Sequence, residues 1–276
     1  MNELSIVVIT YNNYKLKNGT IETLLLSLDA QSDIVFDVIV VDNCSTLVEF
    51  GRLERFISKT AFGFSLSLIR NNCNSISKGR NLGVQYAKGD TILFIDDDTI
   101  ILERDTLIKL LSQAKEGAYG CSAIRGWTVA GWYEANKEEL DSFLKRKEVY
   151  LNIQLQPPVP DVRRKENTRH LVRSYIGNFG FINRRALEQV GFWNERFIGY
   201  GLEDDYMAFL LYINFGEPIR LSTIHVIHIW HEISCENYTQ LDSNQCIFED
   251  LLSNYGVKKF HAGRLLYGDG EIVEYM

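Results

Sequence analysis

The chain has 276 residues, of which 46% are hydrophobic, so it can bury the core of one large domain or two small ones. Its net charge of -7 argues against nucleic-acid binding, for which a basic surface is expected. The five cysteines lack a Cys-x-x-Cys spacing, which disfavours a disulfide framework or structural zinc and favours a reducing, cytoplasmic compartment. No signal peptide is expected, and no apolar run reaches the ~20 residues of a membrane span. A peripheral membrane contact stays open.

The first half of the chain alternates strand-like and helix-like segments. Apolar runs at 4–9, 35–41, 64–69 and 91–95 predict strands. Helical spacing predicts helices at 21–28, 46–59, 77–88 and near 104–116. Near-continuous apolar strands between helices indicate an α/β fold, with a mostly parallel central sheet flanked by helices on both faces. Each strand ends in small polar residues, and open α/β sheets bind ligands at the carboxyl ends of their strands.

Residues 127–172 interrupt this alternation. They contain Trp127, Trp132 and Tyr133, then a charged stretch, then the proline cluster at 157–160. This composition predicts an irregular insertion or a lid rather than a domain linker. The basic run at 163–165 is interpreted as the solvated face of a loop. Regular patterning resumes at 174–182, and a helix is expected at 184–190.

Three carboxylates, Asp96, Asp97 and Asp98, directly follow the fourth predicted strand. Neighbouring acids repel one another, and a divalent cation such as Mg²⁺ or Mn²⁺ relieves that repulsion because it prefers oxygen ligands. On an extended chain Asp96 and Asp98 point to one side and Asp97 to the other. The residues therefore predict a metal site, with an acidic turn that caps the helix near 104–116 as the alternative.

Four sequence blocks resemble the family-2 glycosyltransferases in order and spacing. They are Ser5 to Asn12, Val40 to Ser45, Lys78 to Gly83 and Phe94 to Asp98. The resemblance implies a single GT-A catalytic domain over residues 1–276. It further implies a Rossmann-like, nucleotide-sugar-binding half at 1–125, an acceptor-binding and catalytic half at 126–232, and a C-terminal extension at 233–276.

The resemblance also implies roles for individual residues at the predicted sheet edge. The positions that it assigns to the nucleotide-sugar are Thr10, Tyr11, Asn12, Asp42, Asn43, Arg80, Asp96 and Asp97. Asp42 would accept a hydrogen bond from uracil, Asp96 would lie near the ribose and the metal, and Asp98 would ligate the metal. Asp97 would hold a supporting position. Two alternatives stay open: Asp42 as a strand-end cap, and Arg80 as a surface helix charge.

A second block, Gly191 to Tyr206, resembles the acceptor-side motif of the galactosyltransferase and polypeptide N-acetylgalactosaminyltransferase branches. Mapped onto this sequence, Asp204 would be the general base and Glu203 a ligand of the acceptor. Trp193 and Tyr200 would stack on a sugar, unless they belong to the core. The alternative for the acids is that they only stabilise the first turn of a helix through its dipole.

Two histidines, His228 and His231, follow this block. The same transferase branches supply a metal-ligating histidine here, and His228 fits that place best because an apolar run leads into it. His231 stays a competitor. Residues three apart point to opposite faces of a strand, although both reach one site from a helix or a turn. A mixed carboxylate and imidazole site suits manganese.

The function implied is an inverting transfer of a sugar from a nucleotide-sugar, with a UDP-sugar favoured through the family, to a hydroxyl of a glycan, peptide or small-molecule acceptor. One alternative is a nucleotidyltransferase that makes a nucleotide-sugar. Such enzymes usually carry a glycine-rich, basic loop directly after the first strand. The segment from Thr10 to Tyr14 argues against this alternative, because the segment holds neither glycine nor arginine. The other alternative is a non-catalytic module that binds a sugar nucleotide.

Overall fold

The computed structural model describes residues 3–156, 175, 177–232 and 235–255. One sheet of eight strands runs through these residues, in the order β3-β2-β1-β4-β7-β6-β8-β5. Its first part consists of β1 (Leu4–Thr10), β2 (Phe36–Asn43), β3 (Ser65–Asn71) and β4 (Thr91–Asp96). These four strands pair in parallel, with β1 between β2 and β4. The predicted strands are therefore confirmed, and their carboxyl ends share one edge.

The second part of the sheet is mixed. It contains β5 (Thr99–Ile100), β6 (Tyr119–Trp127), β7 (Phe179–Asn183) and β8 (Ile219–His228). β7 runs antiparallel to both β4 and β6, whereas β6 and β8 are parallel, and the short β5 is antiparallel to β8. The parallel pairing of β6 and β8 places Trp127 beside His228, at the ends of both strands.

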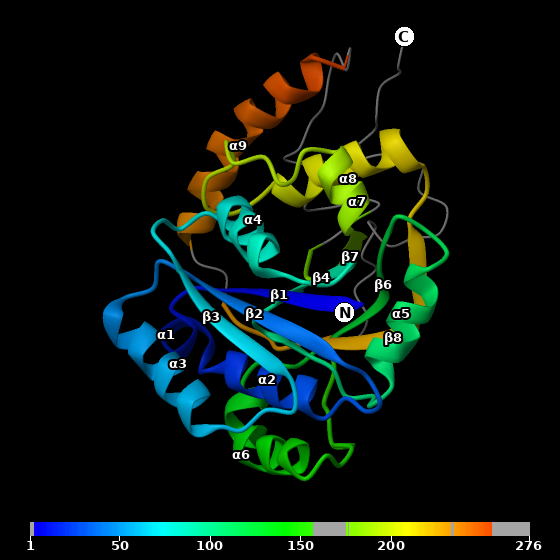
Figure 1. Cartoon of the computed structure of the whole chain (residues 1–276). Coiled ribbons are helices and arrows are strands. Elements are labelled where there is room, and N and C mark those ends of the chain that lie inside the picture. Colours follow the sequence, from blue (N-terminus) through cyan, green and yellow to red (C-terminus); the bar gives the residue numbers. More distant parts are fainter. Residues whose placement is uncertain (1–2, 157–174, 176, 233–234, 256–276) are drawn as a thin grey trace.

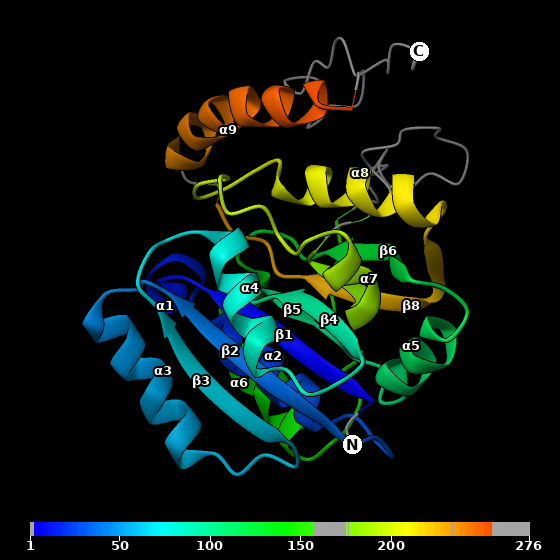
Figure 2. The same ribbon diagram turned by 45° about the horizontal axis from the view of Figure 1, so that its top comes forward.

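Helices cover the sheet on both faces (Figures 1 and 2). One face carries α1 (Asn13–Lys17), α2 (Thr20–Asp29), α3 (Leu47–Lys59) and α6 (Trp132–Lys145), with α5 (Thr106–Ala114) beside β8. The other face carries α4 (Ile76–Tyr86), α7 (Arg184–Gln189) and α8 (Glu203–Phe215), and α9 (Cys235–Ser253) lies outside α8.

Strand β1 shows how the sequence divides the core between the two faces. Its side chains alternate, so Ile6 and Val8 pack with α2, whereas Val7 packs with α4 and α8. All three residues have no exposed surface. The central run of this strand is therefore apolar on both sides, because both faces of the sheet are buried here.

Residues 132–145 correct one expectation, since they form the regular helix α6 instead of irregular structure. Trp132 and Tyr133 are buried where α6 packs on α2, and the Tyr133 hydroxyl lies 2.8 Å from the Thr23 hydroxyl. Lys137 and Asp141 form an ion pair one turn apart. The proline cluster at 157–160 and the basic run at 163–165 lie outside the described residues.

The C-terminal helix α9 packs against α8 and the segment before it. Phe248 of α9 is fully buried together with Phe197 and Tyr206. The described part of the predicted extension is therefore joined to the predicted catalytic half by an apolar cluster. Among the residues that the structure describes, no helix combines the length and the apolar character that crossing a membrane requires.

Candidate active site

Asp97 holds the end of β1 against the end of β4. Its Oδ2 accepts hydrogen bonds from Thr10 Oγ1 at 2.7 Å and from Asn13 Nδ2 at 2.8 Å, and its Oδ1 accepts one from Lys17 Nζ at 2.7 Å. Both oxygens are engaged by the protein itself, and the side chain is buried. Asp97 and Thr10 thus have a structural contact with each other, and their predicted roles toward the nucleotide-sugar stay predictions.

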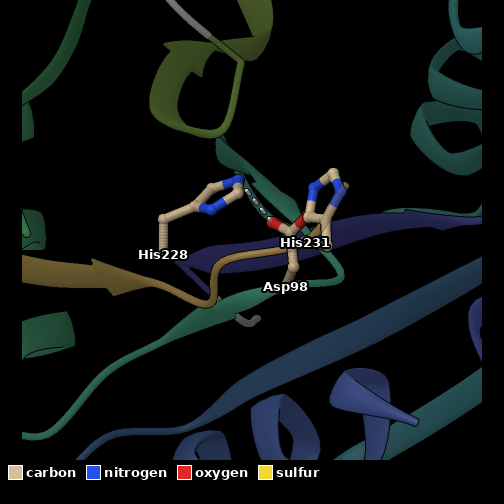
Figure 3. Close-up of side chains that lie close together, drawn as sticks. All are labelled: Asp98, His228 and His231. Carbon is tan, nitrogen blue, oxygen red and sulfur yellow. Dashed lines mark ion pairs between the residues drawn. The ribbon is translucent and has the colours of Figure 1, made fainter. Parts of the chain in front are cut away.

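Asp98 turns instead toward the two predicted histidines (Figure 3). Its Oδ1 lies 3.0 Å from His228 Nε2, and its Oδ2 lies 3.0 Å from His231 Nε2. One ligand atom from each of the three residues falls within 4.8 Å of the others. β8 ends at His228, so the rule that separates residues three apart in a strand no longer holds at His231. Both histidines therefore reach the same acid.

Lys17, which sequence reasoning missed, closes this cluster from α1. Its Nζ lies 2.7 Å from Asp97 Oδ1 and 2.6 Å from Asp98 Oδ2, so one ammonium bridges two neighbouring acids. Burial acts to lower the pKa of Lys17, but Asp97 and Asp98 outweigh it and raise the pKa above its ordinary value. No motif marked this lysine, because it lies in a short polar segment after β1.

The electrostatics keep Asp98 ionised. Burial acts to raise its pKa, but His228 and Lys17 outweigh burial and hold the pKa well below its usual range. For His231, burial acts to lower the pKa, and the hydrogen bond to Asp98 overcomes this and raises it. The acid is thus held as an anion between three nitrogen groups.

The residues present fit a divalent metal ion. One carboxylate and two imidazoles form the mixed oxygen and nitrogen donor set that suits manganese, and a set of three leaves coordination positions for a substrate. The Trp127 ring lies 4.0 Å from the His228 ring, centroid to centroid, and packs it in place. Asp96, which was also predicted as a ligand, is not in this group of donors, and its charge acts on Arg80 instead.

A second pair of acids, Glu203 and Asp204, begins α8 as predicted. Arg80 Nη1 donates to Asp204 Oδ1 at 2.7 Å and lies 3.7 Å from Glu203 Oε1. Glu203 Oε2 also accepts a hydrogen bond from the backbone N–H of Gly201 at 2.9 Å. Arg80 is buried, so its interpretation as a surface charge is wrong. It joins α4, in the predicted donor half, to the predicted catalytic acids.

Burial and the neighbouring Asp204 raise the pKa of Glu203 to about 8, although Arg80 opposes the shift. Near neutral pH Glu203 therefore keeps its proton, and it is the more deeply buried of the two acids.

Trp193 is a core residue, which corrects its predicted role as a stacking surface for a sugar. The Arg80 guanidinium covers its ring at 4.2 Å, and the Phe94 ring packs edge-on at 5.3 Å. It has no face left for a sugar because its side chain is 2% exposed. Tyr200, by contrast, is 38% exposed and stays a candidate for that role.

The segment that carries Tyr200 is held by α9, which no motif indicated. Asn244 is fully buried, and its amide bonds four backbone groups of residues 198–201. Gln240 Oε1 accepts a further bond from the Tyr200 N–H at 2.9 Å. A side chain at Gly199, where φ is +63°, would collide with Gln240. The C-terminal extension thus fixes the loop that leads into Glu203.

The predicted base pocket lies at the ends of β1 and β2. Asn12 Oδ1 accepts from the Thr46 N–H at 2.9 Å, so this side chain ties two loops together. Asp42 accepts from the Ser45 N–H at 3.3 Å, and burial raises its pKa. Asp42 therefore has the contact expected of a strand-end cap. Tyr11 is half-buried, and the Asn43 amide lies 2.8 Å from that of Asn71.

Comparison with known proteins identifies the family of this chain. The family model described as Glycosyl transferase family 2 matches residues 5–191. An uncharacterized glycosyltransferase of Haemophilus influenzae is 38% identical over 96 residues, which are 34% of this chain and 29% of that protein. The matched segment thus spans less than a third of that relative.

Two solved structures share the fold. TarS of Staphylococcus aureus, residues 1–349 in complex with UDP-GlcNAc, has a TM-score of 0.59 and 21% identity over 85% of this chain and 60% of that one. GalNAc-T7 with UDP, GalNAc and Mn²⁺ has a TM-score of 0.63 and 14% identity over 92% of this chain and 50% of that one. The predicted GT-A fold is thereby confirmed. Because the family model spans more than half of its length, the chain belongs to glycosyl transferase family 2.

Proposed function

We propose that this protein transfers a sugar from a nucleotide-sugar, preferably a UDP-sugar, to a hydroxyl of an acceptor, with inversion at the anomeric carbon. One observation carries the proposal. The Asp98–His228–His231 cluster and the Glu203–Asp204 pair are both held to the donor half, by Lys17 and Arg80 respectively. The first cluster would bind the metal ion, and the second pair would serve proton transfer.

The solved neighbours support the choice of donor. One carries UDP-GlcNAc, and another carries UDP, GalNAc and Mn²⁺. In this chain the same sheet edge presents Tyr11, Asp42 and Asn43, which we assign to the nucleotide. Asp42 is buried at the end of β2, where a carboxylate is suited to a hydrogen bond from a base N–H.

Asp98, His228 and His231 would hold the divalent ion. When bound, the ion would neutralise the charge that grows on the diphosphate leaving group. Trp127 packs against His228, and β8 fixes the backbone of that residue. Asp97 keeps Asp98 in register with β1 through its bond to Thr10.

Asp204 is the base in this proposal. Its side chain is 22% exposed, whereas that of Glu203 is 7% exposed, so Asp204 is the better placed to meet an acceptor hydroxyl. Glu203 keeps a proton near neutral pH and is then no base. Removal of the hydroxyl proton by Asp204 allows a single displacement, for which no covalent sugar–enzyme intermediate is needed.

Asp204→Asn tests this assignment. We expect sugar transfer to fall by about 10²–10⁴-fold, the usual contribution of a general base. Transfer is measured as UDP release from UDP-sugars with panels of glycan, peptide and small-molecule acceptors. Binding of UDP with Mn²⁺, followed by thermal shift, should survive because Asp204 is not among the metal ligands.

Glu195→Gln provides a matched control, because Glu195 is exposed and accepts a hydrogen bond from Asn81. Transfer at the wild-type rate by Asp204→Asn would remove Asp204 from the base role. Release of pyrophosphate from UTP and a sugar phosphate would replace the proposal with a nucleotidyltransferase. Binding of UDP without transfer or hydrolysis of any UDP-sugar would favour a non-catalytic module.

A further inference from the structure

Lys17 places a positive charge on a carboxylate oxygen of Asp98, one of the three candidate metal ligands. Its Nζ lies 2.6 Å from Asp98 Oδ2, and the same oxygen lies 3.0 Å from His231 Nε2. The ammonium and the His231 imidazole therefore share one oxygen of Asp98. An ion that is bound to Asp98 and the imidazoles would meet a like charge across one carboxylate.

The surroundings of Lys17 hold it at this place. Asp97 Oδ1 binds the same ammonium at 2.7 Å, and α1, which ends at Lys17, is anchored through Asn13, whose amide bonds Asp97 and Thr20. The lysine side chain is 21% exposed, whereas the Asp97 and Asp98 side chains that its ammonium contacts are 4% and 2% exposed. Asp97 can keep the ammonium when Asp98 turns to another cation.

We propose that Lys17 is an internal cation that competes with the divalent ion for Asp98 and thereby weakens metal binding. The inference rests on the proposed function, because it takes Asp98, His228 and His231 as the metal site. Lys17 then sets how tightly this chain binds the divalent ion. It neutralises the two acids when the ion is away and opposes the ion when it arrives.

Removing the charge should strengthen metal binding for two reasons. The repulsion between the ammonium and the ion disappears, and Asp97 with Asp98 is left with an uncompensated negative charge. Coulomb repulsion between charges this close predicts a fall in the Mn²⁺ dissociation constant of about tenfold or more. A lysine that only anchors α1 would leave this constant unchanged.

The experiment is a titration of the whole chain with Mn²⁺ alone, followed by the electron paramagnetic resonance signal of free Mn²⁺. Lys17→Gln keeps a hydrogen-bond donor for Asp97 and loses the charge, and Lys17→Arg keeps the charge. Lys15→Gln, an exposed residue of the same helix, is the matched control. We expect tighter binding by at least about tenfold only in Lys17→Gln. An unchanged or weaker affinity in that variant overturns the inference.

Asp98→Asn separates this inference from the proposed function. If wild type binds Mn²⁺, Asp98→Asn abolishes the binding and Lys17→Gln leaves it unchanged, the metal site stands and the competition is wrong. If Asp98→Asn has no effect on Mn²⁺ binding in either background, the metal site itself is wrong, and the inference falls with it. Thermal unfolding of Lys17→Gln checks that the variant is folded, and Lys17→Met replaces it if it is not.

Discussion

Two pairs of acids in this protein have the same arrangement around one cation but differ in charge state. Asp97–Asp98 and Glu203–Asp204 are both sequence neighbours, and each pair is bridged by one cation, Lys17 or Arg80. Yet the pKa of Asp98 is held well below its usual range, whereas the pKa of Glu203 is raised to about 8.

The neighbours of each acid explain the difference. Burial acts to raise the pKa of both acids, but Asp98 meets Lys17 at 2.6 Å and two imidazoles at 3.0 Å. Glu203 has Arg80 only at 3.7 Å, while Asp204 takes the shorter contact. Two neighbouring acids with one bridging cation thus form an anionic cluster at one place and hold a proton at the other, according to how closely positive groups reach each oxygen.

Asp98→Asn should break this contrast with the largest effect. The variant loses the anion that joins His228, His231 and Lys17, so we expect loss of Mn²⁺ binding and a fall in transfer of about 10³-fold. Mn²⁺ titration and UDP release measure the two effects. Asp105→Asn, at an exposed position, should leave both unchanged. Wild-type Mn²⁺ affinity in Asp98→Asn would show that Asp98 is not a metal ligand.

Asp97→Asn should show that Asp97 stabilises the fold whereas Asp98 binds the metal ion. Lys17, Thr10 and Asn13 all lose a charged partner, so the free energy of unfolding should fall by about 3 kcal/mol. Denaturation with urea measures this change. The three metal ligands stay in place, and Mn²⁺ binding should persist. A loss of Mn²⁺ binding as deep as in Asp98→Asn would mean that both acids serve one site.

Glu203→Gln should sharpen the contrast through pH, with a smaller effect. The folded chain keeps the Glu203 proton up to about pH 8, whereas the ordinary pKa is 4.5. The folded state therefore binds more protons between these values, and this group lowers the free energy of unfolding as pH rises through them. Glutamine has no such proton to lose.

Relative to wild type, the Glu203→Gln variant should therefore gain stability between about pH 5 and about pH 9, by about 1 kcal/mol or more. Urea denaturation across this range, with Glu195→Gln as the exposed control, measures the gain. Parallel stability curves for wild type and Glu203→Gln would show that Glu203 is ionised like an ordinary acid.

Much of the donor half was predictable because its signals are local. Four apolar runs became β1 to β4, and the polar residues that follow them share one edge because parallel strands end together. The approach of His228 to Asp98 was also expected, from the family resemblance. The choice between His228 and His231 was not, because it depends on where β8 ends.

The features that were missed depend on tertiary packing. Lys17 and Asn244 are ordinary polar residues in sequence, and only the folded chain brings them to Asp98 and to the backbone of residues 198–201. Trp193 resembled a sugar platform until Arg80 and Phe94 covered it. Helix α6 had a usable signal, since Lys137 and Asp141 are one turn apart. The proline cluster at 157–160 nevertheless led to the prediction of irregular structure for all of residues 127–172.

The strand order also bears on how the protein matures. β5 follows Asp98 directly and pairs with β8, and the N–H of Ile229 donates to the carbonyl of Asp98 at 2.8 Å. The two sides of the metal cluster are therefore far apart in the sequence and meet only when the last strand docks. Closing so long a loop is an entropically costly step of folding. A chain that has not docked β8 has β1 to β4 but lacks the Asp98–His228–His231 cluster, so Mn²⁺ binding at this proposed site would report that β8 has docked.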